Sequence, residues 1–137
     1  MTGRRRFTLA ALGLVALPAR AAPASLSDRE RAAFAARAFA LRDEAIRRGD
    51  QPYGAVVVLD ATIVGEGPSR VVKDRDPDAH AERVAIRDAQ RRLGRASLAG
   101  AILYSTSRPC GACQLAAERA GVTRMYYGES LDEVGPR

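Results

Sequence analysis

The sequence predicts an α/β domain in which helices pack on a mixed β-sheet. Three observations support this fold class. Apolar residues repeat at helical spacing over residues 28–48, two β-rich runs separated by a tight turn follow at residues 54–64, and helical and strand patterns then alternate up to residue 127. Because no internal repeat or low-complexity linker divides the chain, we expect a single domain.

The first helix is predicted over residues 28–48. It begins with a capping-box pattern, Ser27-Asp28-Arg29-Glu30, in which the serine oxygen accepts from a backbone amide of the first turn and the glutamate reaches back. Apolar residues follow at helical spacing: Phe34, Ala38, Leu41 and Ala45. Gly49 is a suitable stop, because glycine readily adopts the left-handed conformation that ends many helices.

A hairpin and a second helix are predicted next. The β-rich runs at residues 54–59 and 62–64 flank Asp60-Ala61, which predicts two antiparallel strands joined by a tight turn. Asp76-Pro77 then provides an N-cap and a proline at the first helical position, so we expect the second helix to begin there. This helix carries an apolar stripe and ends at Gly94.

The last part of the domain is predicted to contain a third helix between two strands. Residues 101–105 and 123–127 have strand character, and the helix between them covers residues 110–120. Residues 129–137 are too few for another helix and strand. We therefore expect no further strand after Tyr127.

Residues 1–21 have the pattern of an export signal. Arg4-Arg5-Arg6-Phe7 forms a basic start, a short apolar run covers residues 10–17, and Ala19-Arg20-Ala21 matches a small-x-small cleavage site. The paired arginines resemble the signal of the twin-arginine pathway, so we expect a periplasmic or otherwise exported protein. The apolar run is roughly half of the ~20 residues that span a bilayer. An uncleaved N-terminal helix is the alternative.

Cleavage after residue 21 would leave one domain at residues 22–137 with little net charge. The formal charge of +6 includes four arginines of the predicted signal. Without them the chain has 18 basic and 16 acidic residues, and its formal net charge is +2. The remaining arginines are interleaved with acids or spaced along helices, as on a solvated helix face. We therefore expect a small-molecule substrate, no membrane span after cleavage, and no nucleic-acid partner.

Two short segments contain every histidine and cysteine of the chain. His80 is the sole histidine, and Cys110 and Cys113 form a C-x-x-C pair at the start of the predicted third helix. Residues three apart on a helix share one face, and a helix N-terminus favours the thiolate that binds metal. Three protein ligands with one position left for water are typical of catalytic zinc. Glu82 could take a proton from that water.

Each of these residues also has a simpler interpretation. Cys110 and Cys113 could be a thioredoxin-like redox pair, although the usual tryptophan before the first cysteine is absent and His80 and Glu82 would be left unexplained. His80 alone could be an ordinary core or surface histidine. Glu82 could be a solvated helix residue paired with a neighbouring arginine, and the four tyrosines are expected to serve core or interface packing.

Four segments in this order resemble the cytidine deaminase superfamily of zinc-dependent deaminases, in particular bacterial tRNA adenosine deaminases and guanine deaminases. They cover residues 52–58, 63–67, 76–82 and 103–113. The resemblance implies a three-layer cytidine-deaminase-like fold with helices on both faces of a mixed sheet. It also implies that His80, Cys110 and Cys113 bind Zn²⁺ and that Glu82 shuttles protons while an exocyclic amino group is hydrolysed from a nucleobase, nucleoside or related heterocycle. A homodimer is implied as well.

The chain departs from this family pattern at several positions. Ser69 stands where relatives commonly carry an asparagine that holds the base, and Arg108 replaces the usual acidic residue before Pro-Cys. By analogy, the backbone amide of Ala81 would contact the substrate ring. The family's fifth strand and C-terminal helix have no expected counterpart, so the fold would be shortened at the C-terminus. Two alternatives stay open: an exported thiol-disulfide protein that uses Cys110 and Cys113, and a catalytically degenerate zinc-binding deaminase fold.

Overall fold

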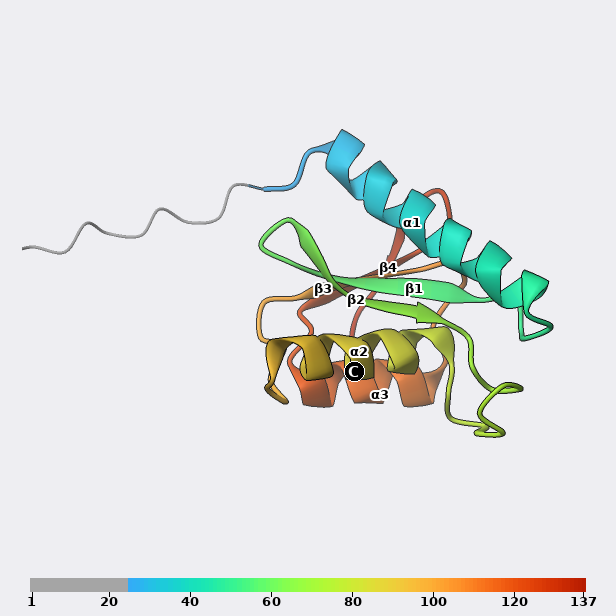
Figure 1. Cartoon of the computed structure of the whole chain (residues 1–137). Coiled ribbons are helices and arrows are strands. Elements are labelled where there is room, and N and C mark those ends of the chain that lie inside the picture. Colours follow the sequence, from blue (N-terminus) through green and yellow to red (C-terminus); the bar gives the residue numbers. More distant parts are fainter. Residues whose placement is uncertain (1–24) are drawn as a thin grey trace, which may run out of the picture.

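The computed structural model describes residues 25–137 and shows a five-stranded sheet covered on both faces by helices (Figure 1). The export signal predicted at residues 1–21 lies outside the described residues. The strand order is β2-β1-β3-β4-β5, and β3 and β4 are the parallel pair. The elements in chain order are α1 (Asp28–Arg47), β1 (Gly54–Leu59), β2 (Thr62–Pro68), α2 (Ala81–Leu93), β3 (Ile102–Ser105), α3 (Gly111–Ala120), β4 (Arg124–Tyr127) and β5 (Asp132–Val134).

The strands alternate their side chains between two cores, which confirms the three-layer α/β prediction. Val56 and Val58 face α1 together with Tyr104. Ala55 and Val57, the intervening residues of β1, face α2 and α3 on the opposite side. In Figure 1, α1 accordingly lies on one face of the sheet, and α2 and α3 lie side by side on the other. Within residues 25–137, no helix has the length and apolarity needed to cross a membrane.

The predicted capping box and hairpin turn are both present. Ser27 Oγ accepts from the backbone amide of Glu30 at 3.2 Å, and Glu30 Oε2 accepts from the backbone amide of Ser27 at 2.8 Å. At the hairpin, Asp60 and Ala61 both have positive φ angles of 50° and 57°, the backbone of a two-residue I′ turn. This turn sets the antiparallel register of β1 and β2.

Strand β2 extends to Pro68, beyond the predicted end at residue 64, and two glycines in it allow α2 to approach closely. A Cβ atom on Gly65 would lie 2.3 Å from the carbonyl oxygen of Ala85, and one on Gly67 would lie 2.2 Å from that of Ala81. Helix α2 therefore rests directly on the backbone of β2. Glycine inside a strand often marks such a close approach of another backbone.

The second helix begins at Ala81 rather than at Asp76-Pro77, so that part of the prediction was wrong. Asp76 Oδ1 accepts from the backbone amide of Asp78 at 2.9 Å, and the backbone amide of Arg70 donates to the carbonyl of Ala79 at 3.0 Å. These bonds hold residues 76–79 in a turn. His80 is consequently the N-cap of α2 and not part of its first turn.

The expectation that no strand follows Tyr127 was also wrong. Strand β5 pairs antiparallel with β4, and the side chain of Val134 is buried next to its register partner Met125. Gly128 and Leu131 have positive φ angles of 73° and 57° and form the tight connection. Three residues suffice for this strand because one buried side chain and a neighbouring strand hold it. Among the described residues no helix follows β5.

Candidate metal centre and active site

His80, Cys110 and Cys113 converge where α2 and α3 begin. His80 and Cys110 are N-caps with extended backbone conformations, and Cys113 lies in the first turn of α3. His80 Nδ1 lies 3.6 Å from Cys110 Sγ and 3.5 Å from Cys113 Sγ. One ligand atom from each of the three residues lies within 4.8 Å of the other two. The three predicted ligands are therefore brought together from two separate segments.

The donor set fits a tetrahedral zinc ion. Zinc bound at about 2.3 Å from a sulfur and about 2.0 Å from a nitrogen, at a tetrahedral angle, places these two atoms about 3.5 Å apart. Both nitrogen–sulfur distances at His80 agree with that separation. No further cysteine or histidine exists in the chain, so three protein ligands leave one position for water or substrate. This is the open arrangement that catalytic zinc sites use.

Cys113 is buried, and its surroundings penalise a bare thiolate. Burial raises the pKa of the Cys113 thiol far above its ordinary value, and the neighbouring Glu82 carboxylate raises it further. A divalent cation would supply the positive charge that a buried thiolate requires. The backbone amide of Cys113 also donates to Cys110 Sγ at 3.4 Å, so the first turn of α3 supports negative charge on that sulfur.

Glu82 is buried beside this cluster rather than solvated on the helix. Its side chain is 5% exposed, Oε1 accepts from the hydroxyl of Ser105 at 2.8 Å, and Oε2 lies 3.7 Å from Cys113 Sγ. None of the ion pairs in the described part of the chain involves Glu82; the adjacent Arg83 pairs with Asp78. A buried carboxylate next to a set of candidate metal ligands is suited to holding and transferring a proton. Ser105 was not anticipated from the sequence.

A hollow of about 500 Å³ opens beside the cluster. Three residues of the site line it: His80, Glu82 and Cys110. The other lining residues are Gln51, Tyr53, Ser107 and Arg108. Tyr53 is 40% exposed here, so it does not pack in the core of the domain. Tyr53 immediately precedes β1 and lies outside the sheet. Arg108 was predicted to lie near the substrate and does line the hollow.

Ser69 and Ala81, the other two predicted substrate contacts, are not among the residues that line this hollow. Ala81 is fully buried against β2. Ser69 is 3% exposed, and its hydroxyl donates to Asp50 Oδ1 at 2.9 Å. In this structure the Ser69 side chain therefore supports a loop.

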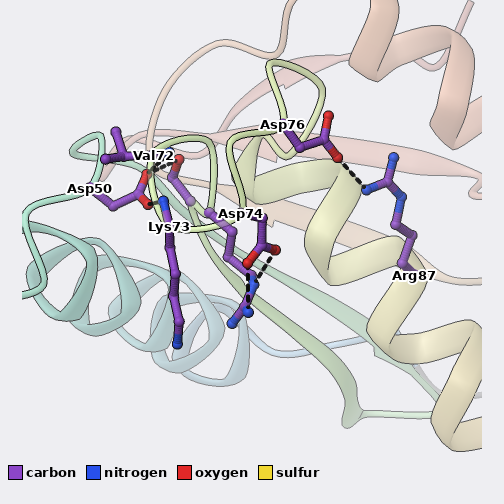
Figure 2. Close-up of polar contacts among 8 residues, drawn as sticks. Asp50, Val72, Lys73, Asp74, Asp76 and Arg87 are labelled. Carbon is purple, nitrogen blue, oxygen red and sulfur yellow. Dashed lines mark hydrogen bonds and ion pairs between the residues drawn. The ribbon is translucent and has the colours of Figure 1, made fainter.

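Asp50 organises the loop between β2 and α2, which ends at His80. Its carboxylate accepts backbone amides from both sides: Gln51 at 2.8 Å, Val72 at 3.3 Å and Lys73 at 2.9 Å. Figure 2 shows the Asp50 side chain pointing at Val72 and Lys73. Burial alone would raise the pKa of Asp50, but these bonds and the Ser69 hydroxyl outweigh it and hold the pKa below its ordinary value. No sequence pattern singled out Asp50.

Two ion pairs brace the remainder of the same loop. Arg70 donates to Asp74 within the loop, at 2.8 and 3.0 Å. Asp76 accepts from Arg87 of α2 at 3.5 Å, which ties the end of the loop to the helix that follows (Figure 2). The segment that presents His80 is thus held at both ends.

A three-layer α/β fold with a His-Cys-Cys cluster beside a buried glutamate defines a zinc-binding domain of the deaminase class. Residues 28–129 match the cytidine and deoxycytidylate deaminase zinc-binding region. This match covers most of the chain, and the protein belongs to that family. Zinc is accordingly its cofactor, with His80, Cys110 and Cys113 positioned as possible ligands.

The chain is similar to deaminases of two kinds. It is 42% identical over 81 residues to a tRNA-specific adenosine deaminase of Agrobacterium fabrum, across 59% of this chain and 53% of that protein. It is 40% identical over 95 residues to a guanine deaminase of Bacillus subtilis, across 69% and 61%. The chain thus spans between about half and three-fifths of the length of these relatives.

Solved structures show the same two likenesses. The crystal structure of Bacillus subtilis guanine deaminase has a TM-score of 0.69 at 36% identity, over 75% of this chain and 64% of that one. A structure from a study of tRNA:A34 deaminases has a TM-score of 0.68 at 38% identity, over 70% of each chain. Both support the family assignment and the fold.

Proposed function

We propose that this protein is a zinc-dependent hydrolytic deaminase that removes an exocyclic amino group from a nucleobase, nucleoside or related heterocycle. The observation that carries the proposal is the buried carboxylate of Glu82, which lies beside the His80–Cys110–Cys113 cluster and lines an open hollow. A metal site alone would be compatible with a structural role. A buried carboxylate that faces both the cluster and the hollow supports a catalytic one.

In the proposed reaction, water and the amine are converted to a carbonyl group and ammonia. When bound, zinc would lower the pKa of water towards neutrality and so supply the nucleophile. Glu82 would accept the proton released from that water and deliver it to the ring nitrogen. It would then take the proton of the hydroxyl group added to the ring carbon and pass it to the amino group, which leaves as ammonia while the carbonyl forms. His80, Cys110 and Cys113 would hold the ion, and Tyr53 presents an exposed ring against which a heterocycle can stack.

The cysteine geometry favours zinc over a redox function. Both sulfurs lie against the same nitrogen of His80, at 3.6 and 3.5 Å, so the two thiols share a third ligand. A thiol-disulfide protein would have no use for that histidine or for the buried Glu82. The burial of Glu82 likewise argues against a degenerate site.

Small-molecule recognition, export and dimerisation are part of the proposal. The arginines on the outer face of α2 are engaged by acids, for example Arg87 by Asp76 and Arg92 by Asp88, which argues against a basic surface for nucleic acid. Residues 1–21 support export to the periplasm through the twin-arginine pathway. A homodimer rests on the resemblance to the family. Cell fractionation tests the export proposal and sedimentation tests dimerisation.

Metal analysis and an ammonia-release screen test the reaction. We expect one zinc per chain and ammonia release from at least one substrate among adenine, guanine, cytosine, their nucleosides and related aminoheterocycles. Glu82→Gln should retain zinc and lose about 10²- to 10⁴-fold in kcat, because general acid–base catalysis contributes that much. Glu118→Gln, on the exposed face of α3, is the matched control and should be unchanged.

Two results would contradict the proposal. A Glu82→Gln variant with the wild-type rate would remove Glu82 from the mechanism. A purified protein that contains no zinc and forms a reducible bond between Cys110 and Cys113 would favour the thiol-disulfide alternative.

A further inference from the structure

Ser105, at the end of β3, makes the shortest polar contact to Glu82. Ser105 Oγ lies 2.8 Å from Glu82 Oε1, and both side chains are buried, at 3% and 5% exposure. An ionised carboxylate can only accept hydrogen bonds, so the serine hydroxyl donates. We propose that Ser105 is a positioning residue that orients the Glu82 carboxylate for proton transfer. This inference rests on the proposed deaminase function.

The backbone around Ser105 is held from both sides. Ser105 is paired in register with Ala55 of β1 and with Tyr127 of β4, and its carbonyl accepts from the amide of Gly128 at 3.0 Å. The hydroxyl therefore projects from a fixed point at the end of the central strand of the sheet. A donor on a rigid element positions a catalytic group more accurately than one on a loop.

The contact with Ser105 restricts the rotation of the Glu82 carboxylate. Oε1 is occupied by the Ser105 hydroxyl, whereas Oε2 is directed towards Cys113 Sγ at 3.7 Å and so towards the metal cluster. If the Ser105 hydroxyl is removed, the terminal torsion of the carboxylate loses this constraint. That torsion is broad in its preference, so the plane of the carboxylate could then turn away from the cluster.

Zinc binding makes the Ser105 hydroxyl more important. The only other donor near Glu82 in the described part of the chain is the thiol of Cys113. A thiol that binds zinc is deprotonated and can no longer donate. Among residues 25–137, the Ser105 hydroxyl is then the one remaining protein donor to the buried carboxylate.

Kinetics of two substitutions test the positioning role. Ser105→Ala should lower kcat by about 10- to 100-fold, the usual effect of losing one hydrogen bond to a charged group, while KM and zinc content stay within about two-fold of wild type. Ser105→Thr retains a hydroxyl and should recover most of kcat. Ser130→Ala removes an exposed serine hydroxyl that contacts Asp132 and not Glu82, and it should change neither kcat nor KM. Equal kcat in wild type and Ser105→Ala would overturn the inference.

A stability cycle on the metal-free protein provides a readout that does not depend on turnover. Ser105→Ala should lower the urea midpoint in the wild-type background and leave it unchanged, or raise it, in a Glu82→Ala background, where no carboxylate needs the hydroxyl. An equal fall in both backgrounds would show that Ser105 acts through packing alone and would overturn the inference. If the wild-type protein releases no ammonia, the proposed function fails, whereas this cycle still tests the contact between Ser105 and Glu82.

Discussion

The close contact between β2 and α2 predicts a large functional effect for a single added methyl group. A Cβ atom on Gly67 would lie 2.2 Å from the carbonyl oxygen of Ala81 and 2.6 Å from the backbone nitrogen of Ala85. Side-chain carbons essentially never come within 3.0 Å of such atoms, so strand and helix must separate by at least the difference between 3.0 and 2.2 Å, which is 0.8 Å. Ala81 lies between His80 and Glu82, so this separation displaces both.

The expected loss for Gly67→Ala follows from this displacement. Misplacing a catalytic group by about 1 Å costs about 100-fold in rate, and forcing extra volume into a packed interior costs about 1–3 kcal/mol of stability. We therefore expect kcat/KM to fall about 100-fold in a steady-state ammonia-release assay, together with a lower urea midpoint. Zinc content, measured on the same sample, shows whether metal is lost as well.

Two other glycines provide matched controls. A Cβ atom on Gly65 would lie 2.3 Å from the carbonyl oxygen of Ala85, about one helical turn further from His80. Gly65→Ala should therefore cost similar stability and less activity than Gly67→Ala. Gly135→Ala meets no atom within 4 Å and should change neither. The reasoning is refuted if Gly67→Ala keeps full activity, or if Gly65→Ala loses more activity than Gly67→Ala.

Two further predictions concern the loop and the hollow. Asp50→Asn places an amide group beside the backbone N–H of Lys73. Because this hydrogen bond is exposed to solvent, we expect a loss of about 0.5–1.5 kcal/mol in the free energy of unfolding, together with a higher KM. Because the pKa of Asp50 is lowered in the folded state, its contribution to stability is complete above about pH 4 and is lost as the pH falls through the lowered pKa. Urea midpoints over a pH series should thus converge for wild type and Asp50→Asn in acid; a constant difference would count against this account. Arg108 lines the hollow and has no ion pair among residues 25–137, so Arg108→Gln should reduce kcat/KM about tenfold more for a phosphorylated or carboxylated substrate than for its neutral analogue. Arg95→Gln is the control, and equal losses on both substrates would exclude charge recognition by Arg108.

Local sequence signals were sufficient where the physical cause is itself local. The capping box at Ser27 and the turn at Asp60-Ala61 involve residues within three positions of each other, and both formed as predicted. The start of α2 was misplaced because Asp76-Pro77 has a genuine N-cap signature. A contact across nine positions decides the outcome there: the amide of Arg70 donates to the carbonyl of Ala79, and the turn persists up to His80.

Local sequence signals could not identify Ser105 and Asp50, the polar residues that support the site. Ser105 and Glu82 are 23 positions apart, and Asp50 contacts Lys73 across a similar separation. Hydrophobic periodicity predicts which face of an element is buried but does not identify which polar side chains meet across elements. The grouping of His80, Cys110 and Cys113 was predictable because their residue types are rare in this chain and suit one kind of chemistry. Serine and aspartate occur at many positions and carry no such information.

The position of the ligands at helix N-caps changes the physical account of the cluster. From the sequence, Cys110 and Cys113 were expected to share one face of a helix. In the structure Cys110 is the N-cap of α3, and its extended backbone conformation places its side chain at the cluster. His80 makes no side-chain capping bond to its own helix, which leaves its imidazole free to face the two sulfurs. Both helices thus direct their N-terminal ends, where the helix dipole is positive, towards two thiols and a carboxylate. The helix ends therefore offset part of the cost of gathering negative charge here, and a divalent cation would supply the positive charge that a buried Cys113 thiolate still requires. The close contact of Gly67 with the backbone of Ala81 keeps the N-terminal end of α2 in place.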